Sequence, residues 1–271
     1  MLSRFARVKT EEVARLKSLK AQGRFPRAWE GLRPSFAGAL APKGGLPAVI
    51  AEYKRASPSR GVICEDVGVE DCALAYAGAG ASALSILTEE AFFKGSLGYL
   101  ARARAALGAA GLGQPLLRKD FICDALQVEA TFATPASALL LIVRFTPDAG
   151  RLRDLRQLAE SQGLDAVVEV FGEADLETAR ESGARIIQVN ARDLDTFKVD
   201  RAACLALARR CPPLPGEAWI AASGVFERAH LEEAGEAGFA ACLVGTALMA
   251  GGRPGEALAR LLGNASAQGE A

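Results

Sequence analysis

Short apolar runs alternate with amphipathic segments along most of this chain. Between the runs lie helical patterns such as Glu173–Ser182, in which Ala174, Leu176 and Ala179 alternate with Glu and Arg. Continuous apolar strands separated by amphipathic helices are typical of a parallel sheet that is buried on both faces. The runs predict eight strands, at Ala48–Tyr53, Ala83–Leu87, Pro115–Arg118, Ala138–Val143, Ala166–Val170, Ile186–Val189, Ala218–Ala221 and Ala240–Val244.

The eight predicted strands begin roughly 20 to 35 residues apart, which is the spacing that strand–helix units require. Eight such units favour closure into a (β/α)8 barrel, the TIM barrel, over an open sheet. A chain of 271 residues can form such a barrel as one domain. We therefore expect a single α/β domain over residues 1–271, with the barrel at 47–263 and a frayed tail at 264–271.

Residues 1–46 precede the first predicted strand, and a disordered tail is one interpretation of them. Thr10 has the side chain of an N-cap, so a helix is expected to begin there. The segment also carries apolar side chains that a folded structure would bury. We therefore expect a helical extension that folds over one mouth of the barrel and buries Leu2, Phe5, Phe25, Trp29 and Phe36.

Composition and charge limit the kinds of partner and cofactor that we expect. Lys plus Arg equals Asp plus Glu at 32 each, so the chain has no net charge that would attract a nucleic acid or a membrane surface. The six cysteines are scattered without a C-x-x-C pair, which is typical of reduced thiols in a cytosolic protein and not of a metal or redox site. The chain has neither a secretory signal nor an apolar run of about 18 residues. We expect a cytoplasmic monomer that binds no nucleic acid, membrane, metal or cofactor.

A single histidine limits the possible chemistry. His230 lies in a charged helical pattern, so a surface position is expected, and no second histidine exists for a metal site or a catalytic triad. Acid–base catalysis would therefore fall to Lys, Glu or Asp.

The first predicted strand ends in a carboxylate and an amine. Residues two apart in a strand face the same side, so Glu52 and Lys54 are expected to project together. The turn residues Ser57–Gly61 then end the strand. Charged side chains at the carboxyl end of a strand are where parallel α/β enzymes keep their catalytic groups, although solvated charges at a strand end would give the same pattern.

The other strand ends carry similar side chains, and in a barrel they form one rim. Lysines, carboxylates and an amide converge there, which favours an enzyme over a non-catalytic scaffold. The glycines and hydroxyls after strands seven and eight can bring backbone N–H groups to a phosphate. The rim residues are Glu52, Lys54, Thr88, Glu89, Lys119, Asp120, Arg144, Glu169, Asn190, Arg192, Ser223, Gly224, Gly245 and Thr246.

Several segments resemble, in order, motifs of the indole-3-glycerol-phosphate synthases. The resemblance covers residues 48–250, almost the whole barrel. The matching segments are Glu52–Gly61 (EYKRASPSRG), Leu87–Glu89 with Phe93–Leu97 (LTE, FKGSL), Leu117–Ile122 (LRKDFI), Val189–Leu194 (VNARDL), Ser223–Val225 (SGV) and Leu243–Met249 (LVGTALM).

The resemblance implies a lyase of tryptophan biosynthesis. Its substrate would be 1-(2-carboxyphenylamino)-1-deoxyribulose 5-phosphate, and its products indole-3-glycerol phosphate, carbon dioxide and water. By resemblance, Lys119 is the general acid for ring closure and Lys54 binds the substrate carboxylate and assists dehydration. Glu169 is the general base, and Glu52 is a catalytic carboxylate. The remaining matches imply that Asn190 orients the substrate, that Ser57, Gly224, Gly245 and Thr246 contact the phosphate, and that Arg192 and Ser223 complete the pocket.

These residue types suit the chemistry. Ring closure builds negative charge on a carbonyl oxygen, which a positioned ammonium can protonate. A cation can hold the substrate carboxylate, an acid must assist loss of the hydroxyl, and a carboxylate can remove the ring nitrogen's proton. No step needs a redox centre or a metal.

The chain departs from the family's pattern at several positions, among them one rim position and one predicted interior position. Ala222 stands where a glutamate is usual, and Gln188 stands at a predicted interior position where glycine is common. Two other functions stay open on the sequence. One is a sugar-phosphate isomerase like phosphoribosylanthranilate isomerase, which would use a cysteine and an aspartate. The other is a non-catalytic barrel that binds a phosphorylated ligand.

Overall fold

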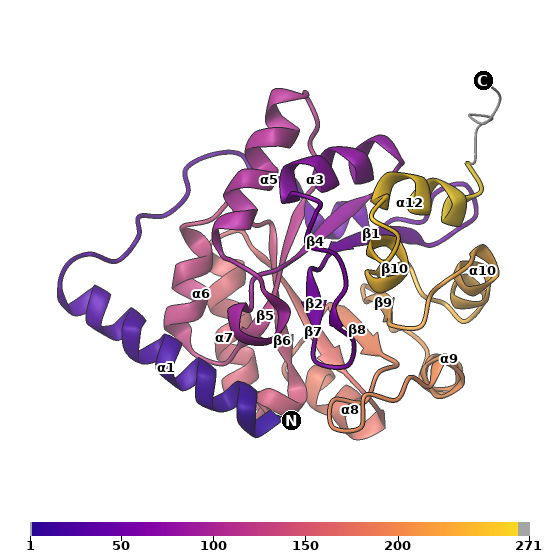
Figure 1. The fold of residues 1–271 in the computed structure, drawn as a ribbon. Coiled ribbons are helices and arrows are strands. Elements are labelled where there is room, and N and C mark those ends of the chain that lie inside the picture. The colour runs from indigo at the N-terminus through magenta and orange to yellow at the C-terminus, as the bar shows by residue number, and fades with distance from the viewer. Residues whose placement is uncertain (1, 265–271) are drawn as a thin grey trace.

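The computed structural model describes residues 2–264, and a closed barrel of eight parallel strands lies at its centre (Figure 1). The strands follow one another around the barrel in the order β1-β4-β5-β6-β7-β8-β9-β10, and β10 pairs with β1 to close it. The predicted TIM barrel is therefore confirmed. The strands are β1 (Ala48–Tyr53), β4 (Ala83–Leu87), β5 (Leu116–Ile122), β6 (Ala138–Ile142), β7 (Asp165–Val170), β8 (Ile186–Asn190), β9 (Ala218–Ala222) and β10 (Ala241–Val244).

Most strand boundaries lie within one residue of the apolar runs, because buried parallel strands are apolar throughout. The exception is β5, which continues past the predicted Arg118 to Ile122. Its pairing with β6 shifts register between Arg118 and Ile122. The polar residues Lys119 and Asp120 are therefore part of a strand, although they interrupt the apolar pattern.

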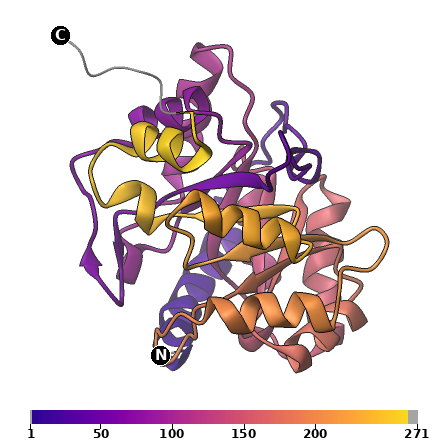
Figure 2. The same cartoon turned by 90° about the vertical axis from the view of Figure 1, so that its right-hand side faces the viewer.

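Helices surround the barrel, as βα units require. Figure 2 shows the orange and yellow helices of the C-terminal half on the outer face of the sheet. The helices that precede, follow or connect the barrel strands are α1 (Leu2–Ala21), α2 (Phe36–Ala39), α3 (Val69–Gly78), α4 (Glu90–Phe93), α5 (Gly98–Ala109), α6 (Ala125–Phe132), α7 (Ala149–Ser161), α8 (Glu173–Glu181), α9 (Arg201–Arg210), α10 (Arg228–Glu236), α11 (Thr246–Met249) and α12 (Pro254–Leu262), with a 3-10 turn at Val143–Phe145. A small hairpin of β2 (Ala56–Ser57) and β3 (Gly61–Val62) follows β1.

Alternate residues of each strand enter two different apolar cores. The larger core lies between sheet and helices and includes Val49 and Trp219, while the smaller fills the barrel and includes Ile50 and Ile220. This alternation is the period-2 geometry of a strand. It also decides which polar side chains, such as Glu169 and Gln188, point inside the barrel.

The N-terminal extension is helical, but it differs from the prediction in three respects. The first helix begins at Leu2, and Thr10 lies inside it with its hydroxyl bonded to the Ala6 carbonyl, so the predicted N-cap is wrong. A Ser/Thr hydroxyl that bonds four residues back is compatible with a helix interior. Trp29 is 38 % exposed and is not part of the core.

The extension also reaches both mouths of the barrel. Phe5 of α1 packs in the interior core beside Phe121 near the carboxyl ends of the strands. Phe36 of α2 is fully buried in the same core, and the backbone N–H of Ala37 donates to Asp165, the first residue of β7. In Figure 1 the indigo helix α1 lies beside α6, which it contacts.

Two other expectations concern the chain ends and the bilayer. Nearly all of the predicted tail, from residue 265 on, lies outside the described residues. Within residues 2–264, no helix combines the length and apolar character needed to cross a bilayer.

Candidate active site

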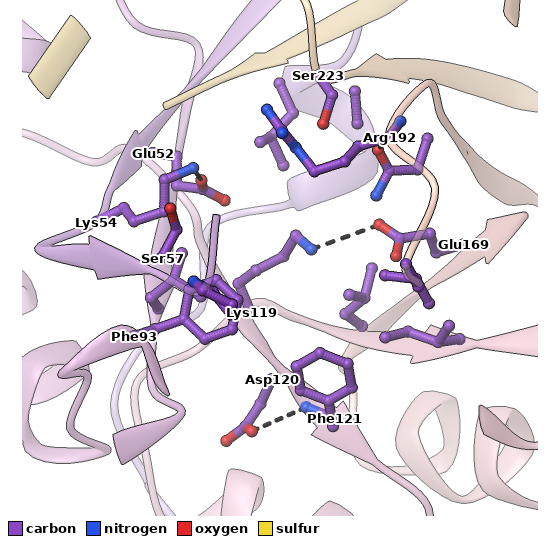
Figure 3. A pocket seen from close by; sticks show the side chains of 18 of the residues that line it. Glu52, Lys54, Ser57, Phe93, Lys119, Asp120, Phe121, Glu169, Arg192 and Ser223 are labelled. Carbon is purple, nitrogen blue, oxygen red and sulfur yellow. Dashed lines mark hydrogen bonds and ion pairs between the residues drawn. The ribbon is translucent and has the colours of Figure 1, made fainter. Parts of the chain in front are cut away.

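A cleft of about 830 Å³ opens at the carboxyl ends of the barrel strands (Figure 3). All five residues predicted for catalysis line it, from four different strand ends. Ser57, Arg192, Ser223 and Thr246 line it as well, so the fold gathers residues from position 52 to position 246 around one space. The catalytic candidates are Glu52, Lys54, Lys119, Glu169 and Asn190.

Lys119 and Glu169 face each other across the barrel interior, from β5 and β7 (Figure 3). Lys119 Nζ lies 3.4 Å from Glu169 Oε2. The carboxylate is almost fully buried, at 1 %, whereas the lysine side chain is 17 % exposed toward the cleft. Within residues 2–264 the other oxygen of Glu169, Oε1, has no hydrogen bond, and Lys119 has no second anionic partner. A cation and a carboxylate are therefore available to a ligand in the cleft.

Glu52 of β1 and Lys54, which directly follows β1, form a second pair. Lys54 Nζ donates to Glu52 Oε1 at 2.9 Å, and the hydroxyl of Ser85 donates to Glu52 Oε2 at 3.3 Å. Both partners of the pair are largely buried. The predicted same-side projection of residues 52 and 54 is confirmed.

Gly245 is required by this second pair. A Cβ at this position would collide with Oε1 of Glu52 and would lie 3.1 Å from Nζ of Lys54. The absence of a side chain at the end of β10 thus lets the carboxylate and the amine occupy the barrel mouth.

Arg192 is a cation without a carboxylate partner among residues 2–264. It donates to the Phe197 carbonyl at 3.1 Å, and its backbone N–H donates to Asn190 Oδ1 at 3.0 Å. Burial, together with the nearby charge of Arg60, lowers the pKa of Arg192. A half-buried guanidinium that faces another cation is an environment that an anion would stabilise.

Beside Arg192, the loops after β9 and β10 border a smaller recess of about 350 Å³. Ser223 and Gly224 both have positive φ, at 72° and 78°, which is unusual for a serine. Both residues line this recess. Gly224 is also tightly enclosed, since a Cβ there would lie 2.6 Å from Arg201.

The opposite wall of the cleft is aromatic. Phe5 stacks on Phe121 with ring centroids 3.9 Å apart, and Phe93 lies 6.2 Å from Phe5. All three line the cleft. The sequence had identified these side chains only as apolar residues or as parts of motifs. Their convergence depends on where α1 packs, which no local signal indicates.

Other rim residues are engaged in structural contacts. Glu89 accepts hydrogen bonds from the backbone N–H groups of Ala91, Phe92 and Phe93 and so caps α4. Arg144 pairs with Asp175 at 3.0 Å. The half-buried His230 accepts a hydrogen bond from the Phe226 backbone, and no metal-binding cluster of His, Cys, Asp or Glu occurs within residues 2–264.

The chain also matches a family model and known proteins. The family model described as "Indole-3-glycerol phosphate synthase" matches residues 2–261. A protein of that name from Desulfotalea psychrophila is 39 % identical over 268 residues, which cover 96 % of this chain and 98 % of the relative. Another from Chlorobium phaeovibrioides is 42 % identical over 250 residues, covering 91 % and 93 %.

Solved structures support the fold. The "Crystal Structure of 3-Hexulose-6-Phosphate Synthase" superposes with a TM-score of 0.61 at 16 % identity, covering 79 % of this chain and 97 % of that one. At this identity the likeness concerns the barrel alone.

Proposed function

This chain belongs to the indole-3-glycerol phosphate synthase family, and from that premise we propose which residues carry the reaction. The enzyme is a carboxy-lyase of tryptophan biosynthesis. It converts 1-(2-carboxyphenylamino)-1-deoxyribulose 5-phosphate into indole-3-glycerol phosphate, carbon dioxide and water. The two alternatives, a sugar-phosphate isomerase and a non-catalytic barrel, lose their basis with this assignment.

Ring closure joins the aromatic carbon that bears the carboxylate to the ketone carbon. In our proposal Lys119 donates a proton to the carbonyl oxygen as the new bond forms. The support is its position: Lys119 lines the cleft, is partly exposed, and lies 3.4 Å from Glu169 without forming a close bidentate pair. This single pair, within reach of a ligand, carries the mechanistic proposal.

Decarboxylation and dehydration follow. The carboxylate leaves as carbon dioxide and its electron pair returns to the ring; the new hydroxyl then leaves with a proton as water. We assign Lys54 to hold the carboxylate and to assist the loss of water, with Glu52 as its carboxylate partner at 2.9 Å. Glu169 accepts the proton released as the indole becomes aromatic, through the oxygen that has no partner.

The proposal also assigns a place to each end of the substrate. We propose that the phosphate binds in the smaller recess and contacts Gly224, Gly245 and Thr246, with Ser57 on the β2–β3 hairpin and with Arg192 and Ser223 beside it. Asn190 orients the sugar, since its amide nitrogen has no partner within residues 2–264 while its oxygen is fixed by Arg192 N–H. The aryl group packs against the aromatic wall.

The test is an assay of purified protein with the carboxyphenylamino-deoxyribulose phosphate, followed by indole fluorescence. We expect Lys119→Ala to lower kcat by about 10²- to 10⁴-fold, the range of a general acid, while substrate binding stays measurable. Lys17→Ala, at an exposed position of α1, is the matched control and keeps normal turnover. Near-normal turnover of Lys119→Ala would refute the acid assignment, and wild-type protein without product would refute the function.

The oligomeric state, the domain organisation and the location of the protein are also proposals. We propose that the chain acts as a monomer, folds as a single domain over residues 1–271 and works in the cytoplasm. Two observations support the monomer: the charge of the chain is balanced, and one chain supplies a complete set of candidate residues. Light scattering coupled to size exclusion would measure the mass, and a dimer would overturn it.

A further inference from the structure

The amide of Gln188 makes a contact that its place in the sequence did not indicate. Gln188 points into the barrel from β8 and is fully buried. Its Nε2 donates to Glu169 Oε2, while its Oε1 is buried and has no hydrogen-bond partner within residues 2–264. Because an ionised carboxylate only accepts hydrogen bonds, the amide nitrogen must face Glu169 and the oxygen must face away from it.

The unpaired oxygen of Gln188 lowers the stability of the fold. A buried amide oxygen without a donor costs free energy, and an apolar side chain of similar volume would avoid that cost. Gln127, another fully buried glutamine, shows the contrast: its Oε1 accepts from Cys123 N at 2.9 Å, and its Nε2 donates to the Phe121 carbonyl at 3.2 Å. Gln127 is satisfied at both ends, as a structural amide should be. Gln188 is satisfied only toward Glu169.

The strands around Gln188 offer Glu169 no replacement for this bond. On the other side of Glu169, the residue opposite it in β6 is the apolar Ile142. In the β8–β9 register, Gln188 pairs with Ile220 and Asn190 pairs with Ala222. Neither Ile220 nor Ala222 has a hydrogen-bonding side chain. Among residues 2–264, the donors to the Glu169 carboxylate are Lys119 and Gln188, and both contact Oε2.

We propose that Gln188 is the positioning residue of Glu169. It holds Oε2 toward the barrel wall, so that Oε1 faces the cleft as the proton acceptor. The inference rests on the proposed function. Once Lys119 has given its proton to the substrate, its amine is neutral and its attraction for Glu169 falls; the neutral amide keeps its hydrogen bond to the carboxylate through that step.

The main experiment compares Gln188→Leu with wild type. We expect kcat to fall roughly 10- to 100-fold, as for a lost hydrogen bond to a charged group, with KM changed less than about threefold. The melting temperature should stay equal or rise, because the unpaired oxygen is removed. The acidic limb of the kcat profile should move to higher pH, since the ionised carboxylate loses a donor.

Two further variants separate positioning from packing. Gln188→Glu keeps the shape of the side chain. Its carboxyl can hydrogen-bond to Glu169 only when one of these two carboxyls is protonated, so the acidic limb of the variant's kcat profile should also move to higher pH. Gln127→Leu, the matched control, should lower the melting temperature and leave the limb in place.

The outcomes are distinct. If both Gln188 variants keep kcat within about twofold and the limb unmoved, the inference is wrong, although the proposed function stands. A lower melting temperature of Gln188→Leu with normal kcat would mean that Gln188 only packs. Wild-type protein that forms no indole product would instead refute the proposed function itself.

Discussion

Lys119 and Asp120 are adjacent in β5, yet their side chains belong to two very different ionic clusters. Asp120 accepts from Lys9 of α1 at 2.6 Å, from Arg118 at 2.9 Å and from the Thr88 hydroxyl at 2.6 Å, and Glu12 pairs with both cations. Among the described residues, 2–264, Lys119 has one ionic partner, Glu169, at 3.4 Å. The first cluster, Lys9–Glu12–Arg118–Asp120, is called here the α1 network.

The difference teaches how to tell the structural charges of this barrel from those proposed for catalysis. In the α1 network Lys9, Arg118 and Asp120 are buried, Glu12 is partly buried, and each charge has more than one partner, which is the condition under which a buried ion pair persists. In the cleft, the Lys119–Glu169 pair is long and leaves one carboxylate oxygen without a partner. Saturated charges fix the position of α1, whereas unsaturated charges remain available to a substrate.

The largest expected effect on stability comes from breaking the saturated side. Asp120→Asn leaves Lys9 and Arg118 with too little negative charge in a buried site, so we expect a loss of about 3–5 kcal/mol in the free energy of unfolding. Asp154→Asn, at an exposed position of α7, is the control and should change little. Denaturant unfolding measures both. A loss no larger than that of Lys119→Ala would erase the contrast between the two clusters.

Gly245→Ala tests the open side. The added Cβ would collide with Glu52, so the Glu52–Lys54 pair must move, at a cost of about 1–3 kcal/mol for overpacking. Turnover should fall about tenfold or more because small displacements in an active site reduce rate strongly. Gly251→Ala has open space around its Cβ and should keep normal kcat. Steady-state kinetics and melting temperature decide, and a fully active Gly245→Ala enzyme would contradict the close approach.

The pH dependence of stability gives the finest distinction. Burial alone would raise the pKa of Asp120, but the charges of Arg118 and Lys9 outweigh it and hold that pKa well below 3.8. Burial would lower the pKa of Lys9, but Asp120 and Glu12 raise it above 10.5. Unfolded Asp therefore binds a proton more readily than Asp120 does in the folded state, and unfolded Lys loses one more readily than Lys9 does.

The network's stabilisation is consequently full between about pH 4 and pH 10.5 and fades as the pH moves through the folded-state values outside that window. The difference in unfolding free energy between wild type and Asp120→Asn should be constant from pH 5 to 9. It should shrink in stronger acid, because unfolded Asp takes up a proton near its usual pKa of about 3.9. A difference that grows in acid would reverse the assigned sign.

Part of this protein followed directly from its sequence. The eight strands were predictable because a strand covered on both sides must be apolar throughout, and seven of them match the structure within one residue at each end. Lys54 and Glu52 share a face by the alternation of a strand. The ordered motifs then supplied the family and the candidate residues, since each motif is local in the chain.

Tertiary structure decided the rest, because it depends on contacts between distant segments. Packing of the extension against the barrel sets three features: the start of α1 at Leu2, the stacking of Phe5 on Phe121, and the burial of Phe36 in the interior core. The division of labour between Lys119 and Asp120 depends on which element covers each face of β5. Likewise, the sequence identified Gln188 only as a departure at a predicted interior position. The β7–β8 register, with Glu169 opposite Gln188, is what brings its amide to the carboxylate.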